Sequence, residues 1–325
     1  MPFYNSRMAR DLTEATHELD NAAAVFLSAR PRLFGIAYRM LGSAAEAEDI
    51  VQDTWIRWQS ADRSEVLEPA AFLATITTRL ALNVAQSARS RRETYIGPWL
   101  PEPVDTESDP YLGAERGEAL SLALLLLLEK LSPAERAAYV LREAFDYPYS
   151  TIADILQSTE VNVRQIVSRA RRHVAEDGRR PALAPALDDQ NKLLEAFIRA
   201  AQKGEVQELE RLFAAEIVSI TDGNGVVNAA RKPVFGAPTV ARFIASFSSH
   251  FWTGSEVAYI VANGQPAALF SRDGAVYVMA TLETGPDGIS RIMWVMAPEK
   301  LVLISRSWPE PPSDGHGSRP PLPSG

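Results

Sequence analysis

The segment VNVRQIVSRARRHVAE, Val161 to Glu176, separates apolar from basic residues in a way that predicts one amphipathic helix. Its apolar residues recur at steps of three and four, which predicts a buried stripe: Val163, Ile166, Val167, Ala170 and Val174. Four arginines and no acid stand between Val161 and His173. Because the whole chain has a formal net charge of −8, this local positive charge needs an explanation.

A shorter helix is predicted just before this one, over YSTIADILQ, Tyr149 to Gln157, and Thr159 stands where an N-cap is expected. A helix, a tight turn and a longer basic helix form the helix-turn-helix layout. Arginine pairs with phosphates and guanine edges, while Asn, Gln and Ser reach bases. The predicted DNA-binding residues are Thr159, Asn162, Arg164, Gln165, Ser168, Arg169, Arg171 and Arg172. A solvated basic face is the alternative.

The composition limits the classes of protein. With 325 residues, of which 46% are apolar, the chain is long enough for two or three domains. It has no cysteine and four scattered histidines, so we expect no disulfide, no metal and no cofactor. The most apolar run, Ala119 to Leu128, is about half of the ~20 residues that a membrane span needs. We therefore expect a buried helix there, no membrane contact and a cytoplasmic protein.

Two proline-rich breaks divide the sequence, at IGPWLPEPVDTESDP, Ile96 to Pro110, and at GRRPALAPALDD, Gly178 to Asp189. The expected organisation is helical domains over 20–95 and 118–178, linkers over 96–117 and 179–187, a third domain over 188–310 and a disordered tail over 311–325. The third domain begins with helical patterns and continues with short apolar runs separated by NG, DG and PDG turns. These signals predict an α+β domain with a curled antiparallel sheet.

Near the amino terminus, AEAEDIVQDTWIRW predicts a helix with an apolar stripe: Ala47, Ile50, Val51, Thr54 and Trp58. Glu46, Asp49 and Asp53 fall on another face, which repels DNA and suits a different partner, or is merely solvated. In the next predicted helix Leu73, Ile76, Leu80 and Val84 form the stripe. That leaves a second candidate DNA-binding face: Arg79, Asn83, Gln86, Ser90, Arg89, Arg91 and Arg92.

These segments carry a family resemblance. LSPAERAAYVLREAFDYPYSTIADILQSTEVNVRQIVSRARRHV resembles region 4 of extracytoplasmic-function sigma factors. RPRLFGIAYRMLGSAAEAEDIVQDTWIRWQS, Arg30 to Ser60, with EPAAFLATITTRLALNVAQSARSRRE, Glu68 to Glu93, resembles region 2. The order, with no region 3, implies two all-α domains that recognise promoters for RNA polymerase core.

The resemblance also implies roles for particular residues. The acidic helix of region 2 docks on the β′ clamp helices, which assigns polymerase binding to Glu46, Asp49, Gln52 and Asp53, and the β flap is a further implied contact. The following helix grips the −10 element, and ADRSEVLEP before it matches the base-selecting loop or is an ordinary interhelix loop. The helix-turn-helix binds the −35 element. Gln157 replaces a frequent glycine and Asn83 a frequent acid, which puts the promoter sequence in doubt.

The linker and third domain resemble sigma factors with a fused SnoaL-like domain, a cone-shaped α+β barrel. The shared stretches are WLPEP, comprising Trp99, Leu100, Pro101, Glu102 and Pro103, and partial matches at DGNGV and APEKL, Ala297 to Leu301. The resemblance implies a regulatory contact through Asp222, Gly223, Asn224 and Gly225, although DGNG is equally a hairpin turn. An unknown small ligand in the barrel is a further possibility.

An enzymatic third domain would use Asp222, Arg242, His250 or Asp273 for proton transfer. Both aspartates stand in turn sequences, where Asp is common, so we expect no catalysis. The sequence predicts a sigma factor whose third domain docks on the linker and region 2. The alternatives are a ligand-sensing repressor, which has no use for the acidic helix, and a bifunctional enzyme. Polymerase supplies most of the DNA affinity of a sigma factor, which explains why only local basic surfaces are needed.

Overall fold

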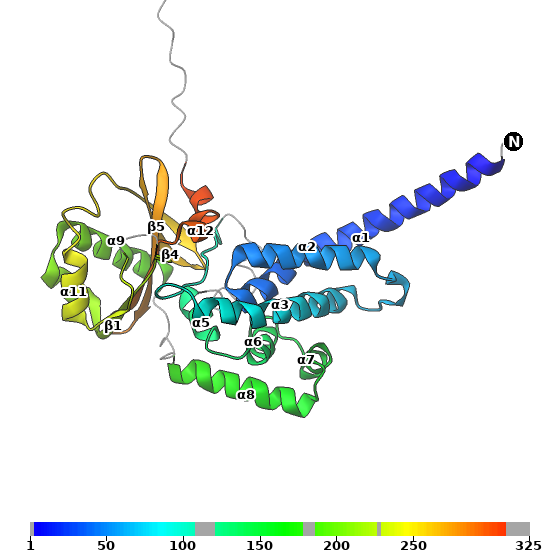
Figure 1. Cartoon of the computed structure of the whole chain (residues 1–325), viewed down its shortest axis with the longest axis horizontal. Helices are drawn as coiled ribbons and strands as arrows, with labels where there is room; N and C mark the ends of the chain where they lie inside the picture. The colour runs from blue at the N-terminus through cyan, green and yellow to red at the C-terminus, as the bar shows by residue number, and fades with distance from the viewer. Residues whose placement is uncertain (1–2, 108–120, 178–185, 226–228, 310–325) are drawn as a thin grey trace, which may run out of the picture.

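The computed structural model describes residues 3–107, 121–177, 186–225 and 229–309, with side chains outside 3–19, 88–93 and 176–177. These residues form two helical units and then an α+β unit, in the order that the sequence predicts (Figure 1). The tail predicted to be disordered, 311–325, lies outside the described residues.

The first unit comprises α1 (Phe3–Leu41), α2 (Ala44–Ser60), the 3-10 turn η1 (Arg63–Glu65) and α3 (Pro69–Glu93). The stripe predicted on α2 is buried. The polar atoms within it are hydrogen-bonded: the Thr54 hydroxyl lies 3.1 Å from the Thr77 hydroxyl, and Trp58 Nε1 donates to the carbonyl of Ala22 at 3.0 Å. The buried hydroxyl of Thr54 and the buried indole nitrogen of Trp58 therefore both have hydrogen-bond partners.

The second unit comprises α5 (Leu122–Leu128), α6 (Pro133–Tyr139), the π-helical turn η3 (Val140–Ala144), α7 (Tyr149–Leu156) and α8 (Glu160–Asp177). The apolar run yields the buried helix expected, α5. Gln157 has a left-handed backbone, φ 52°, in the turn before α8, a conformation that glycine adopts without strain. The predicted N-cap is confirmed, since Thr159 Oγ1 accepts from Asn162 N at 3.2 Å.

The two helical units share one hydrophobic core, with α3 against α6 and α7. Buried Arg136 of α6 donates from Nη1 to the carbonyl of Met40 in α1 at 2.6 Å. Arg32 of α1 donates to the carbonyl of Phe145 at 2.8 Å and lies over the Tyr147 ring. The units therefore form one closed body.

The third unit begins with α9 (Leu187–Lys203) and α10 (Val206–Leu212). Its strands are β1 (Phe213–Asp222), β2 (Val234–Phe235), β3 (Glu256–Ala262), β4 (Gln265–Arg272), β5 (Ala275–Gly285) and β6 (Gly288–Val295). Helix α11 (Ala237–Ala245) follows β2, and α12 (Pro298–Leu301) and η4 (Ile304–Ser307) follow β6.

The sheet has the strand order β2-β1-β6-β5-β4-β3 and is mixed. The prediction of a wholly antiparallel sheet was wrong for one pair, because β1 runs parallel to β6, with Thr221 opposite Trp294 and Asp222 opposite Val295. The NG, DG and PDG turns do join antiparallel hairpins, β3–β4, β4–β5 and β5–β6. Turn residues report pairing only between consecutive strands, and β1 is far from β6 in the sequence.

The two faces of the sheet have different partners. On one face Phe270, Ala280 and Trp294 pack with α9 and α11. On the other, Leu269, Met279 and Val295 belong to the same core as the helical units and the linker. Figure 1 shows the sheet between α9 and α11 on one side and the helical units on the other. The linker therefore passes along the inner face of the third unit.

Candidate functional site

The acidic face of α2 is open to solvent. Asp49, Gln52 and Asp53 are exposed, and Glu46 is half-buried in the first turn. Ile56, one turn further along, leaves 60% of its surface exposed. Sequence reasoning missed this isoleucine, although it falls outside the apolar stripe of the helix. An apolar residue bordered by exposed acids suits a protein partner better than DNA.

The predicted DNA face of α3 is open at Asn83 and Gln86, which are both exposed. Arg79 instead reaches the carboxyl end of α7, where Nε donates to the carbonyl of Ile155 at 3.0 Å and Nη2 to that of Asp154 at 2.9 Å. A cation is stabilising there because the last carbonyls of a helix lack partners within it. The side chains of Arg89, Arg91, Arg92 and Ser90 lie outside the described residues.

Helix α8 presents all the side chains predicted for it, from Asn162 to Arg172, on its exposed face. Three of its arginines have acidic neighbours. Arg164 pairs with Glu160 and lies over the Tyr149 ring, with 4.4 Å between its guanidinium carbon and the ring centroid. Arg171 pairs with Glu143 at 2.7 Å, a hydrogen bond that raises the pKa of Arg171. Arg169 lies 4.0 Å from Glu135.

The linker, here residues 94–107, makes a buried contact with the third unit. Asp222, at the end of β1, accepts from the Leu100 amide at 2.8 Å and from the Tyr95 hydroxyl at 2.6 Å. Lys300 of α12 donates to the same carboxylate and to the Leu100 carbonyl, each at 2.6 Å. Both backbone groups of Leu100 are therefore held by one ion pair. We refer to Tyr95, Trp99, Leu100, Asp222 and Lys300 as the interdomain contact.

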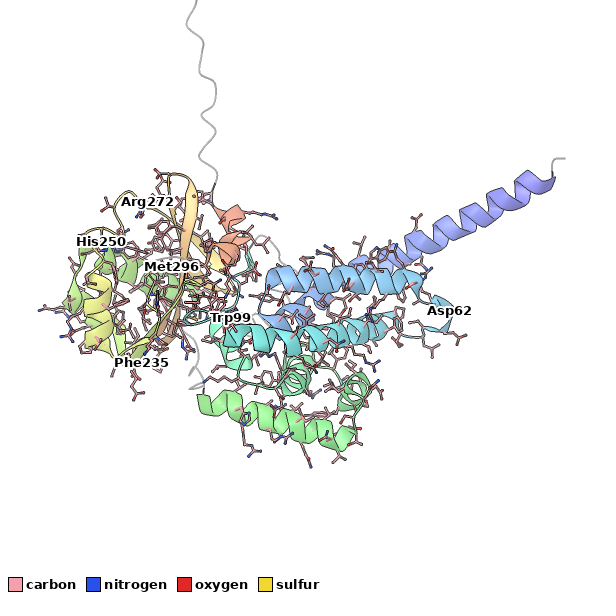
Figure 2. All side chains as sticks on the ribbon, in the orientation of Figure 1. Asp62, Trp99, Phe235, His250, Arg272 and Met296 are labelled. Atoms are coloured by element: carbon pink, nitrogen blue, oxygen red, sulfur yellow. The ribbon has the colours of Figure 1, made fainter. Side chains whose placement is uncertain are left out.

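Aromatic side chains surround the ammonium group of Lys300. Its Nζ lies 4.8 Å from the centroid of the Tyr95 ring and 4.4 Å from that of Trp99. Asp222 and Lys300 are both buried, so each charge needs the other together with these neighbours. Trp99 also lies against Gly42 of the first unit, where a Cβ would come within 2.6 Å of its ring. Figure 2 shows Trp99 at the junction of the units.

Glu102, the acid of WLPEP, ties the linker to the first unit. Its carboxylate accepts from the amide of Ala44 at 2.9 Å and from the Ser43 hydroxyl at 3.0 Å, at the start of α2. Its own amide donates to the carbonyl of Gly42 at 2.8 Å. A carboxylate is favoured at a helix amino terminus, where amide groups lack partners. Pro101 and Pro103 on either side of it are buried.

Asn263, in the β3–β4 turn of the third unit, contacts both the linker and the first unit, and sequence reasoning missed it. Its Nδ2 donates to the Tyr38 hydroxyl of α1 at 2.7 Å, while its backbone amide donates to the carbonyl of Val104 at 2.9 Å. Tyr38 in turn donates to the carbonyl of Glu102 at 2.7 Å. Burial raises the pKa of Tyr38, which keeps the phenol in the donor form. In the sequence, Asn263 signals only a hairpin turn.

Two of the remaining residues of DGNG, Asn224 and Gly225, also face α12 or the linker. Asn224 Nδ2 donates to Glu299 at 2.8 Å, and Gly225 lies against Ile96, whose side chain a Cβ would approach to 3.1 Å. Gly223 lies against Ala229. The structure thus brings together the two segments that the sequence singled out, WLPEP and DGNG.

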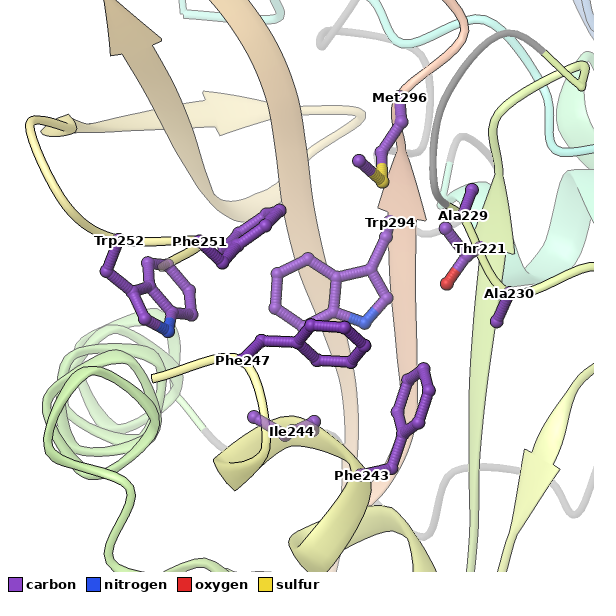
Figure 3. Close-up of a pocket in the computed structure, with 10 residues that line it drawn as sticks. All are labelled: Thr221, Ala229, Ala230, Phe243, Ile244, Phe247, Phe251, Trp252, Trp294 and Met296. Atoms are coloured by element: carbon purple, nitrogen blue, oxygen red, sulfur yellow. The ribbon is translucent and has the colours of Figure 1, made fainter. Parts of the chain in front are cut away.

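The third unit also contains an apolar cavity, lined by residues of β1, α11 and β6 and of the segments before β2, after α11 and after β6 (Figure 3). Asp222, Arg242, His250 and Asp273 are not among the residues that line it in the described part of the chain. Asp222 instead belongs to the interdomain contact, and the other three are exposed. The candidates for proton transfer therefore do not converge on this cavity.

Two family models match the helical units: sigma-70 region 2 over residues 25–92 and sigma-70 region 4 over residues 121–174. The chain is 35% identical to the ECF RNA polymerase sigma factor SigJ of Mycobacterium tuberculosis over 290 residues, covering 85% of this chain and 92% of that protein. The chain belongs to the extracytoplasmic-function sigma factors. It is also 31% identical to a probable ECF RNA polymerase sigma factor, SigI, of the same species, over 87% of this chain and 95% of that protein.

The likeness to SigJ extends to the third unit of this sigma factor. The crystal structure of M. tuberculosis SigJ has a TM-score of 0.70 at 28% identity and covers 86% of this chain and 98% of that chain. Sigma factors are not enzymes; they bind RNA polymerase core and promoter DNA. Among the described residues, no helix is long and apolar enough to span a bilayer and no cluster of metal-ligating side chains occurs.

Proposed function

We propose that this sigma factor recognises promoters through α3 and α8, binds polymerase core through the acidic face of α2, and is regulated by its third unit, a SnoaL-like domain. The observation that carries the regulatory part is the interdomain contact, in which Asp222 and Lys300 hold both backbone groups of Leu100. The functional modules follow the boundaries expected from the sequence, and the protein acts in the cytoplasm together with polymerase.

The division of charge between the helices supports the assignment of partners. Asp49, Gln52 and Asp53 expose negative and polar groups beside Ile56, a surface that DNA phosphates repel and a basic protein surface attracts. Helix α8 exposes arginines along one face, and Thr159, which caps it, and Asn162 in its first turn are exposed, which suits the amino-terminal end of a recognition helix. On α3, Asn83 and Gln86 expose polar side chains that can approach DNA.

The closed arrangement opposes simultaneous binding of both promoter elements. The −10 and −35 elements are roughly 25 base pairs apart, which is about 85 Å along B-DNA at ~3.4 Å per base pair. In the closed body, however, α3 packs directly against α7, and Arg79 binds the end of that helix. Promoter binding therefore requires the two helical units to separate. Arg79 leaves the carbonyls of α7 at the same step and becomes available to DNA.

The third unit makes this separation harder because it fixes the linker at several points. Leu100 is held by Asp222 and Lys300, Val104 by Asn263, and Thr106 by the carbonyl of Val261. Glu102 meanwhile binds the start of α2. Residues 94–107 of the linker, held at these points, cannot extend between two promoter elements. The third unit thus acts as a built-in inhibitor of opening.

Co-purification and footprinting test the promoter-recognition part of this proposal. The full chain, mixed with RNA polymerase core, should co-elute with core and protect two DNA segments about 25 base pairs apart in a promoter library. Core alone is the control, and it should give no such pair of protected segments. Protection without core, at a single site, would instead favour the ligand-sensing repressor.

A further inference from the structure

The cavity of the third unit is large enough for a small molecule. Its volume is about 60 Å³. One water needs roughly 10–15 Å³ of such volume, so the cavity has room for several waters. Several waters occupy the volume of one six-membered ring. All free space among the lining atoms, including the mouth, amounts to about 480 Å³.

The lining defines the chemistry of an occupant. Five aromatic side chains dominate it: Phe243, Phe247, Phe251, Trp252 and Trp294 (Figure 3). Phe243 and Phe247 meet edge to face at an interplanar angle of 82°, as do Phe251 and Trp294 at 83°. Such a lining offers ring faces and edges to a further ring. The lining has no charged side chain within the described residues, so an ion would lose its hydration without compensation.

Three side-chain polar groups occur among these lining residues, and one of them, the Trp294 indole Nε1, already donates to the Ser219 hydroxyl at 3.1 Å. Thr221 supplies a hydroxyl group from β1. The indole Nε1 of Trp252 is buried and has no hydrogen-bond partner among the described residues, a costly state for a donor. The Thr221 hydroxyl points toward the other lining residues, so an occupant with one oxygen or nitrogen atom would hydrogen-bond to it (Figure 3). The cavity therefore favours an uncharged aromatic ring that carries one hydrogen-bonding substituent.

The strands that line the cavity also carry the interdomain contact. Thr221 faces the cavity, and the next residue of β1, Asp222, faces the linker, because successive side chains of a strand point to opposite faces. Trp294 and Met296 line the cavity, and the chain continues from them into α12, which carries Lys300. The Met296 amide donates to the carbonyl of Asp222 at 2.7 Å, which joins the two segments.

We propose that this cavity binds a small, uncharged aromatic compound with one hydrogen-bonding substituent, and that its occupancy shifts Asp222 and Lys300 and so changes their hold on the linker. The binding part stands on the cavity alone. The effect on the linker rests on the proposed regulatory function of the third unit.

Fluorine NMR of the full chain tests the binding part. The probe is 4-fluorophenol, with 4-fluorocyclohexanol as the saturated counterpart and 4-fluorobenzoate as the charged counterpart. We expect saturable one-to-one binding of 4-fluorophenol, about tenfold tighter than binding of either counterpart, because aromatic contacts and the absence of charge both favour it. Equal binding of all three probes, or no saturable binding, would overturn the site.

Three variants locate the binding. Ala230→Phe fills the cavity and Phe247→Ala removes one of its aromatic walls, and each should weaken binding of 4-fluorophenol about tenfold or more. Phe235→Ala is the matched control, since Phe235 is an aromatic residue of the same unit that exposes 67% of its surface and does not line the cavity. Thr221→Val, which is nearly isosteric, keeps the test decisive if a larger change disturbs folding. Unchanged binding in Ala230→Phe and Thr221→Val, with native circular dichroism, contradicts the assignment.

Limited proteolysis of the linker tests the coupling. Saturation with 4-fluorophenol should change the rate of cleavage within residues 94–107 several-fold, and Ala230→Phe should abolish that change. Binding without any change in cleavage would overturn the coupling. Failure of the proposed regulation itself is distinguishable, because it would appear in transcription by variants of Asp222 and Lys300 with no ligand present.

Discussion

At the scale of single residues, Asp222 is the group on which the linker depends most. One carboxylate accepts from Tyr95, Leu100 and Lys300, and none of its own surface is exposed. Lys300 is the cation of this contact, and its ammonium group lies 2.6 Å from the Asp222 carboxylate. Its positive charge is neutralised by Asp222 and further stabilised by cation–π contacts with two aromatic rings.

Asp222→Ala should therefore cost more than the double variant Asp222→Ala/Lys300→Met. The single change leaves an ammonium group buried without its partner, a loss of about 3–5 kcal/mol in the free energy of unfolding. The double change removes both charges and should recover a large part of that loss. Chemical denaturation of the single and double variants measures the difference. A double variant as unstable as Asp222→Ala, or less stable, would contradict the pairing.

Tyr95 gives the interdomain contact a dependence on alkaline pH. Burial first, and then the hydrogen bond to Asp222, raise the pKa of Tyr95. A raised pKa means that the stabilising form is the neutral phenol. Its contribution is complete below the ordinary tyrosine pKa of about 10 and is lost as pH rises through the folded value. In a spectrophotometric titration of tyrosinate, Tyr95→Phe should remove one late-titrating tyrosine from the native protein. Loss of an ordinary tyrosine instead would contradict the contact.

At the scale of elements, α2 and α8 divide the partners between them. Exposed acids on α2 and exposed arginines on α8 occupy helices whose opposite faces are buried in one core. The core therefore holds each surface in place, and the exposed residues can be substituted without altering the core.

Reversal of charge on α2, by Asp49→Lys with Asp53→Lys, should abolish co-purification with polymerase core while the chain stays folded. Both side chains are exposed, so the effect on stability should be within about 0.5 kcal/mol. The matched control, Glu256→Lys with Asp287→Lys, makes the same charge change on exposed residues of the third unit. If both double variants bind core equally, the assignment of α2 is wrong.

Substitution of the α8 arginines should weaken promoter binding. Arg164→Ala or Arg171→Ala should cost about 1–3 kcal/mol if the arginine reads a base. Each also loses an exposed ion pair, worth no more than about 1 kcal/mol of stability. Electrophoretic mobility shifts of the polymerase complex measure the effect, with exposed Arg211→Ala of α10 as the control. Unaltered binding in both variants would remove α8 from the DNA surface.

The elements differ in how far the sequence predicts them. The stripes of α2 and α8 were predictable because a buried helix face repeats every three to four residues. The hairpins were predictable from Asn263-Gly264 and Asp273-Gly274, which have positive φ. The parallel pairing of β1 with β6 was not, since no local turn encodes it. The contact of Arg79 with α7 was also missed, because an arginine face looks the same whether it meets phosphates or the end of a helix.

At the scale of the whole molecule, the linker joins the first unit to the third. Trp99 lies against the first unit and Lys300, Glu102 binds the start of α2, and Asn263 reaches Tyr38 from the sheet. The family resemblance singled out WLPEP and DGNG, and the structure places Leu100 and Asp222 of these segments in contact. Sequence reasoning did not anticipate Tyr38 and Asn263, because a buried hydrogen bond between distant residues leaves no periodic signal.

The most direct test of the regulatory claim is run-off transcription by reconstituted holoenzyme on a promoter recovered by footprinting. The variant Asp222→Ala/Lys300→Met lacks the ion pair that holds Leu100, and Trp99→Ala lacks the ring that lies against Gly42 and Lys300. Asp273→Asn is the control, since this exposed turn residue, φ 53°, tolerates Asn and has no part in the interdomain contact. If the third unit restrains opening, the first two proteins yield several-fold more transcript than the native chain, and the control equals it. Equal transcript from all four proteins, at equal occupancy of core, would contradict the claim.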